Sequence, residues 1–166
     1  MQHGRETTVL LASCHWPPRQ LPIPLGTELD WAWLLRTARQ HHVLALVAET
    51  LLALSPRQLT PAVREHLAGY RAAVGLRNTY LARELVGLLE QLERGGIVAL
   101  PFKGPVLALG LYGDLARREF SDLDLLIHPH DVQAAKQLLV DRGYQLEPPL
   151  DPEPAAYVAR LSGARE

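Results

Sequence analysis

The sequence has a single cysteine, Cys14, and no long hydrophobic run. One cysteine cannot form an internal disulfide, so a reducing compartment is the simpler assumption. The longest apolar stretches, such as residues 43–48, fall well below the roughly 20 residues that a membrane-spanning helix needs. The apolar run at residues 8–12 is too short for a signal peptide and follows the charged Arg5 and Glu6. These absences predict a cytoplasmic protein that makes no contact with a membrane.

An excess of charge of either sign is also missing. The 166 residues include 17 Lys and Arg and 18 Asp and Glu, which gives a formal net charge of −1. This balance excludes a polybasic nucleic-acid coat or an acidic tail as the whole function. A chain of this length can bury roughly two thirds of its unfolded surface, enough for one domain without metal or disulfide support. The 15 arginines against 2 lysines indicate a GC-rich bacterial coding sequence.

Four prolines between residues 17 and 24 mark the first boundary in the chain. Because proline removes a backbone donor, residues 1–27 are predicted to form an extended lead-in. Apolar residues then recur at steps of three and four, which predicts a helical region over residues 28–95. Its longest helix is expected to start at Thr60-Pro61, an N-cap followed by proline, and to end at Gly95-Gly96, with a kink near Gly75.

Beyond this glycine pair the apolar period changes from helical to strand-like. Strands are predicted over residues 97–102, 122–127 and 144–146, and helices over residues 105–112 and 130–142. This order predicts an α+β fold in which residues 96–166 form a core with a short mixed sheet. The proline-rich tail that follows carries a short helical pattern and no further strand, so we expect the core to be incomplete at its C-terminal side.

The segment Ser121-Asp122-Leu123-Asp124 carries the strongest chemical signal. Residues two apart in a strand point to one face, roughly 6.5 to 7 Å apart, so Asp122 and Asp124 would present paired carboxylates. Desolvating carboxylates is costly unless a cation or hydrogen bonds compensate, and Mg²⁺ or Mn²⁺ with phosphate oxygens suits them best. The alternative is an exposed edge strand on which Asp122 caps a turn. Asp-x-Asp pairs are common on surfaces, so the acids alone leave both interpretations open.

The segment Phe102-Lys103-Gly104-Pro105 joins the first strand of the core to the helix after it. Gly104 allows the backbone to come close to a ligand, and Pro105 suits the first helical position, so free N–H groups would face outward. Such a helix N-terminus binds phosphate, and Lys103 would add a mobile positive charge. The alternative is a tight turn with a solvated lysine. Together, phosphate donors and paired carboxylates predict a site for a nucleoside triphosphate.

With these segments in place, the sequence resembles the bacterial family of uncharacterised nucleotidyltransferases, within the DNA polymerase beta-like nucleotidyltransferase superfamily. The resemblance runs from about Trp31 to Tyr144. It is carried by a Lys-Gly turn, a tyrosine, an arginine and an Asp-x-Asp-Leu-Leu segment, here Lys103-Gly104, Tyr112, Arg118 and residues 122–126. Residues 41–43, Asn78 and Gly143-Tyr144 also belong to it.

The resemblance implies transfer of a nucleoside monophosphate from a nucleoside triphosphate to an acceptor, with release of pyrophosphate. It implies Asp122 and Asp124 as the catalytic and metal-binding acids, with Mg²⁺ or Mn²⁺ as the cofactor. It also implies four nucleotide-binding residues, which are Lys103, Gly104, Arg118 and Ser121. The acceptor stays open between a protein, a small molecule and a nucleic-acid end.

The sequence departs from the superfamily at a third carboxylate, which normally lies on a later strand. The acids nearby, Glu147, Asp151 and Glu153, lie among prolines, where a regular strand is not expected. Glu147 is the one that we nominate as a substitute, and without a third acid we expect little or no transfer activity. Two alternatives are a nucleotide-binding or partner-binding module on the same fold, and a helical interaction protein acting through residues 28–94.

Overall fold

The computed structural model describes residues 3–18, 21, 25, 29–54 and 57–145. It begins with helices α1 (Gly4–Ser13), α2 (Trp31–Gln40), α3 (Leu44–Leu54) and α4 (Pro61–Arg94). Strand β1 (Ala99–Phe102), helix α5 (Gly104–Tyr112), the 3-10 turn η1 (Leu115–Arg117) and strand β2 (Asp124–Ile127) follow. The 3-10 turn η2 (Pro129–Asp131) and helix α6 (Val132–Asp141) come last. This confirms the predicted α+β class.

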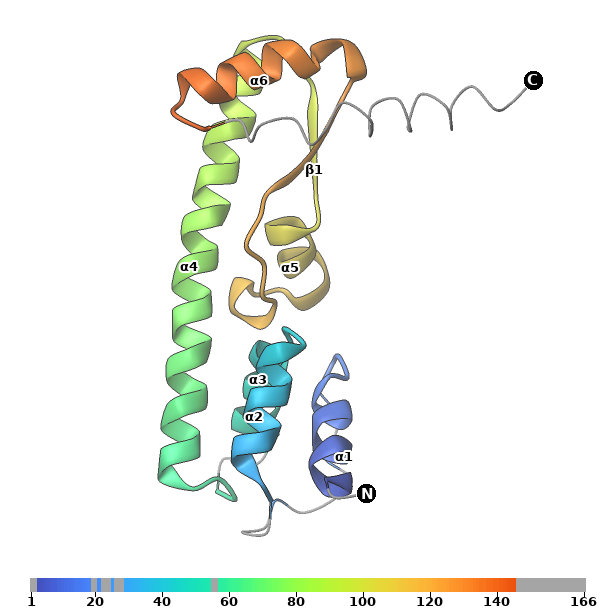
Figure 1. Ribbon diagram of the computed structural model, residues 1–166, viewed down its shortest axis with the longest axis vertical. Coiled ribbons are helices and arrows are strands. Elements are labelled where there is room, and N and C mark those ends of the chain that lie inside the picture. The colour runs from blue at the N-terminus through green and yellow to red at the C-terminus, as the bar shows by residue number, and fades with distance from the viewer. Residues whose placement is uncertain (1–2, 19–20, 22–24, 26–28, 55–56, 146–166) are drawn as a thin grey trace, which may run out of the picture.

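Helix α4 lies along one side of the molecule and runs from one end to the other (Figure 1). Helices α1, α2 and α3 gather at one end, whereas the strands and α6 lie toward the other, with α5 and η1 between them (Figure 1). None of the helices in the described ranges is both long and apolar enough to cross a membrane.

Each end of the molecule is packed around its own apolar cluster. The larger one joins α1, α2, α3 and the first turns of α4, and includes Val9, Leu34, Leu51 and Leu67, all with fully buried side chains. The smaller one forms around Leu92, Ile97 and Ala135, where α6 and the sheet meet the end of α4. The segment that leads from η1 to β2 lies between these clusters and packs on the middle of α4 (Figure 1).

The prediction of an extended lead-in over residues 1–27 is wrong for its first half, because Gly4–Ser13 forms α1. Val9 and Leu10 of this helix are buried in the larger cluster. The Glu6 side chain accepts a hydrogen bond of 2.8 Å from the backbone N–H of Asp30. Helix α1 therefore depends on partners more than 20 positions later in the chain, which its short apolar run could not reveal.

The ends of α4 follow the local signals that predicted them. Thr60 accepts a hydrogen bond of 3.3 Å from the backbone N–H of Val63, and Pro61 occupies the first turn. At the other end Gly96 has φ 74°, and the N–H of Ile97 returns to the carbonyl oxygen of Leu92 at 2.9 Å. This is a Schellman C-cap, and Ile97 and Leu92 also pack together in the smaller cluster.

Gly75 does not interrupt α4, and the helix shows no sharp bend along its length (Figure 1), so the kink predicted there is not seen. A Cβ at Gly75 would lie 3.2 Å from the Cβ of Ala116 in η1. Glycine at this position therefore serves the close approach of η1 to the helix rather than a bend in it.

Replacing Gly75 by Val should lower the free energy of unfolding by roughly 2 kcal/mol, because the added atoms have to push η1 away from α4. Gly69 lies on the same helix, and a Cβ there would meet no atom within 4 Å, so Gly69→Val is the matched control and should be close to neutral. Urea unfolding of both variants measures the difference. Equal midpoints would show that η1 adjusts freely.

Strands β1 and β2 form an antiparallel pair in which Leu100 lies opposite Leu126 and Phe102 opposite Asp124. The predicted third strand does not begin at Tyr144 or Gln145, and Leu146 lies outside the described residues. Instead, the N–H of Tyr144 caps α6 by donating to the carbonyl oxygen of Leu139 at 3.0 Å. Its hydroxyl then donates to Glu84 on α4 at 2.8 Å, so the chain turns back onto that helix.

Candidate functional site

Two consecutive residues with positive φ join β1 to α5. Lys103 has φ 57° and ψ −148°, and Gly104 has φ 40°. A lysine in this region costs about 1 to 3 kcal/mol of backbone strain, which is found where the surroundings require one geometry. A Cβ at Gly104 would lie 3.3 Å from the backbone oxygen of Asp122. The close approach predicted for Gly104 is therefore made to the backbone of Asp122, which lies beside the first turn of α5.

The first turn of α5 has the predicted form. Pro105 occupies one of its first two positions, and both Gly104 and Pro105 are buried. Pro105 has no backbone N–H and the N–H of Leu107 donates to the carbonyl oxygen of Lys103, which leaves the N–H groups of Gly104 and Val106 in the first turn without an acceptor in the helix and available for an anion. Helix α5 ends at Gly113, which has φ 65° and lies in the left-handed region.

Lys103 and Asp124 meet across the end of the sheet. The Lys103 Nζ lies 3.6 Å from the Oδ1 of Asp124 and 5.1 Å from the centre of the Phe102 ring. Lys103 is 57% exposed and Asp124 25% exposed. An ion pair of this exposure contributes at most about 1 kcal/mol, so a ligand can separate the two side chains at little cost.

Asp122 lies two residues before β2, so the predicted strand starts later than expected and contains only Asp124 of the pair. Asp122 is exposed and lines a cavity of about 270 Å³ together with Arg118 and Ser121. Four further residues complete the lining, namely His42, Arg77, Glu119 and Phe120. The structure thus divides the predicted residues into two neighbouring groups, and Asp122 belongs to both.

Helix α4 holds the segment that carries Arg118 and Asp122. Asn78 is fully buried, and its side-chain amide donates to the carbonyl oxygens of Leu115 and Arg118, each at 2.7 Å. Arg77 donates to the carbonyl oxygen of Phe120 at 2.6 Å. These three bonds fix the backbone over residues 115–120. Sequence reasoning assigned Asn78 no role beyond the resemblance, although a polar residue on the apolar face of a long helix was a visible signal.

Glu119 anchors the same segment to the helical end of the molecule. Its side chain, 8% exposed, accepts a hydrogen bond of 3.1 Å from the backbone N–H of Ala45 at the start of α3. Its other oxygen lies 3.9 Å from the Nδ1 of His42. Burial is the main reason that the pKa of Tyr70 is raised to about 12, and a hydrogen bond to Glu119 raises it further. The phenol therefore stays neutral near pH 7. No sequence signal pointed to Glu119.

Arg117 and Arg118 point to different surroundings. Arg117 pairs with Glu49 on α3 at 2.9 Å and lies 4.7 Å over the ring of Trp16. Glu49 also pairs with Arg71 at 2.7 Å, which links α3, α4 and η1. Arg117 therefore serves the packing of the helices, whereas Arg118 lines the cavity beside Asp122.

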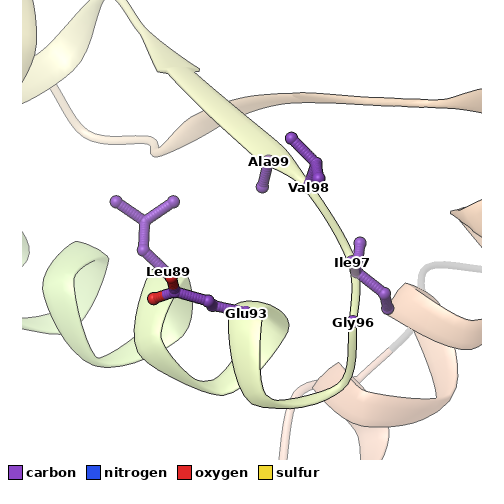
Figure 2. Close-up of a pocket in the computed structure, with 6 residues that line it drawn as sticks. All are labelled: Leu89, Glu93, Gly96, Ile97, Val98 and Ala99. Carbon is purple, nitrogen blue, oxygen red and sulfur yellow. The ribbon is translucent and has the colours of Figure 1, made fainter.

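Two further cavities contain none of the six predicted site residues. One, of about 400 Å³, lies between the last turns of α4 and β1, with Glu93 as its one ionisable lining residue (Figure 2). The other, of about 710 Å³, lies over the outer side of the sheet, where Leu100 and Leu126 are 62% and 61% exposed. Neither is lined by a lysine, an arginine or a pair of carboxylates, which the prediction requires.

The carboxylates of Asp122 and Asp124 are the right type of donor for a hard divalent cation. No group of three or more His, Cys, Asp or Glu side chains placed to hold a metal occurs in the described part of the chain. Glu147, Asp151 and Glu153, among which a third acid was sought, lie outside the described residues. The two acids fit a cation that takes its remaining ligands from phosphate oxygens and water, as Mg²⁺ commonly does.

Residues 27–162 match the family described as uncharacterised nucleotidyltransferase. The chain belongs to this family. The nucleotidyltransferase match covers the helices from α2 onward, the sheet and all six predicted site residues, and it confirms the resemblance found in the sequence. No curated protein and no solved structure matches the chain.

Proposed function

We propose that this nucleotidyltransferase moves a nucleoside monophosphate from a nucleoside triphosphate to an acceptor hydroxyl in a metal-dependent reaction. A bond forms between the acceptor oxygen and the α-phosphorus, and the bond from that phosphorus to the bridging oxygen of the β-phosphate breaks. Pyrophosphate leaves, and the proton of the hydroxyl passes to solvent. The family supports nucleotidyl transfer as the general reaction.

The chain's own residues would hold the reacting groups in place. The first turn of α5 would bind the β- and γ-phosphates through its free N–H groups, and Lys103 would swing from Asp124 onto a phosphate oxygen. Asp122 and Asp124 would hold a divalent cation against the same phosphates. When bound, this ion would neutralise charge on the triphosphate and on the leaving pyrophosphate. Arg118 and Ser121, which the resemblance implies as nucleotide-binding, line the cavity beside Asp122.

One observation carries this proposal: the start of α5 lies against the backbone of Asp122. A Cβ atom placed on Gly104 would be 3.3 Å from the Asp122 backbone oxygen. A phosphate seat and a metal-binding acid are useful to a nucleotidyltransferase only when they adjoin, and the contact between Gly104 and Asp122 supports this arrangement. Calorimetric titration with each nucleoside triphosphate, in Mg²⁺, Mn²⁺ and chelator, tests it. Equal affinity with and without a divalent ion would contradict the role of the acids.

Lys103→Ala should weaken the affinity for the Mg²⁺ nucleotide by about 10-fold, the effect of losing one charge-assisted hydrogen bond. The chain offers a matched control, because Lys136 on α6 is its other lysine and is exposed. Lys136→Ala should leave the affinity unchanged. If both substitutions weakened binding equally, the nucleotide would be attracted by overall charge and not held at the Lys103 turn.

A binding module without transfer is the second candidate. It is favoured by the finding that the described residues contain no group of three or more His, Cys, Asp or Glu side chains placed to hold a metal. Incorporation of a labelled nucleotide into a panel of acceptors separates the two candidates, since the module would bind the Mg²⁺ nucleotide without transferring it. Glu147→Gln extends this test, because loss of incorporation with intact binding would identify Glu147 as the missing acid.

A further inference from the structure

The cavity beside Asp122 is a different place from the turn that would bind the triphosphate. Lys103, Gly104 and Asp124 do not line it. Its walls come instead from His42 in the α2–α3 connection, Arg77 on α4, and the segment from Arg118 to Asp122. Asp122 therefore adjoins both the start of α5 and this cavity.

Two arginines, Arg77 and Arg118, line this cavity, and neither forms an ion pair with a carboxylate among the described residues. Arg118 makes no ion pair with them, and its Nη1 is buried with no hydrogen-bond acceptor. Its guanidinium lies 6.0 Å from the centre of the Phe120 ring, which leaves its donors uncommitted. Among the described residues, Arg77 donates a hydrogen bond only to the carbonyl oxygen of Phe120. A buried guanidinium donor without an acceptor is costly, and an oxyanion bound beside it would reduce that cost.

The two acids that line the cavity, Glu119 and Asp122, differ in their surroundings. Glu119 already accepts from Ala45 and Tyr70 and faces His42 at 3.9 Å. The Asp122 carboxylate is exposed and would repel an anion until a divalent cation binds there. An anion in the cavity and a cation at Asp122 should therefore favour each other.

The size of the cavity limits what it can hold. Its volume of about 270 Å³ is below the roughly 300 to 1,000 Å³ of pockets that enclose a whole drug-sized ligand. Two arginine forks and the hydroxyl of Ser121 are typical donors for a single phosphate group. The net charge of −1 gives no basic surface along which a nucleic acid would extend.

We propose that this cavity binds a phosphate group on the acceptor, which is a small phosphorylated molecule with a free hydroxyl. The inference rests on the proposed function and adds the class of the second substrate. The triphosphate occupies the Lys103 turn, the acceptor phosphate occupies the Arg118 cavity, and the metal at Asp122 lies between them. Arg118 is then a determinant of the acceptor, and His42 and Arg77 bring the helical region into its recognition.

The native chain provides the first test. Inorganic phosphate is titrated by calorimetry into protein saturated with Mg²⁺ and an α,β-methylene nucleoside triphosphate, which cannot transfer its nucleotide. We expect phosphate to bind in the presence of the analogue and not to lower the affinity for the analogue, because the anion and the cation at Asp122 favour each other. Competition between the two, or no phosphate binding while the analogue binds, would overturn the inference and leave the proposed function standing. Binding of phosphate without any binding of the analogue would instead contradict the proposed function.

Substitutions then assign the two anions to their residues. Arg118→Gln should weaken phosphate binding by about 10-fold or more and the analogue much less, whereas Lys103→Ala should do the reverse. Arg83→Gln changes an exposed arginine that lies on α4 outside the cavity, so it is the matched control and should alter neither. An Arg118→Gln variant that loses the analogue as strongly as Lys103→Ala would place the triphosphate in the cavity and overturn the inference.

The source of the phosphate is decided by incorporation assays. A phosphorylated sugar and its dephosphorylated form are compared with a short oligonucleotide that ends in a 3′-hydroxyl. Preference for the phosphorylated small molecule by about 10-fold or more supports the inference. Efficient labelling of the oligonucleotide, or equal labelling of the two sugars, overturns it.

Discussion

Replacing Asp124 by Asn should collapse the metal dependence of nucleotide binding. Two unit charges 4 Å apart interact by about 4 kcal/mol at an effective dielectric constant of 20, so Asp122 and Asp124 repel a triphosphate strongly unless a cation is bound. We expect native affinity to be on the order of 100-fold higher with Mg²⁺ than with chelator. In Asp124→Asn this ratio should fall at least about 10-fold, because the amide holds the ion poorly and repels the phosphates less.

The same substitution frees Lys103 from its contact of 3.6 Å with Asp124. Affinity in chelator should therefore rise while affinity in Mg²⁺ falls, and opposite changes of this kind are not expected from a general loss of structure. Asp141→Asn, an exposed acid on α6, is the control and should change neither value. An Asp124→Asn variant that kept the native ratio would show that Asp124 takes no part in holding the metal.

Local signals predicted most elements of the fold. The caps at Thr60 and Gly96 act through neighbouring backbone groups, so both ends of α4 could be read from a few residues. Helix α1 could not, because its stability comes from packing against α2 and α3. Gly75 was misjudged for the same reason: the Ala116 that it accommodates is about 40 positions away in the chain.

The candidate site likewise has one part that local sequence signals predict and one part that depends on contacts between distant residues. Lys103 and Gly104 follow β1, and Asp124 begins β2 with Asp122 just before it. Pairing of β1 with β2 is therefore enough to bring the four residues together. The cavity around Arg118 needs contacts between residues 37 or more positions apart, such as those of Asn78 with Leu115 and Arg118. Periodicity places Asn78 on a helix but does not show which backbone oxygens it meets.

Asn78→Ala should be the most destabilising single change in the middle of the molecule. Asn78 is fully buried, and its amide supplies donors to two carbonyl oxygens, those of Leu115 and Arg118. Removing the amide leaves both oxygens without this donor and opens a cavity, which together should cost roughly 3 kcal/mol or more. Because Arg118 and Ser121 follow on the same segment, phosphate affinity should also fall at temperatures where the variant remains folded.

Thr79→Ala is the matched control for this prediction, since Thr79 is the next residue of α4 and its hydroxyl bonds only to the carbonyl oxygen of Gly75 on the exposed side. It should change the free energy of unfolding by no more than about 0.5 kcal/mol. Urea unfolding followed by circular dichroism gives both values, and calorimetry with inorganic phosphate gives the second readout. If Asn78→Ala unfolded at the same urea concentration as Thr79→Ala, the two carbonyl bonds would not be what holds residues 115–120 on α4. The arrangement of the Arg118 cavity would then have to come from Arg77 and Glu119, whose bonds to Phe120 and Ala45 remain intact in that variant.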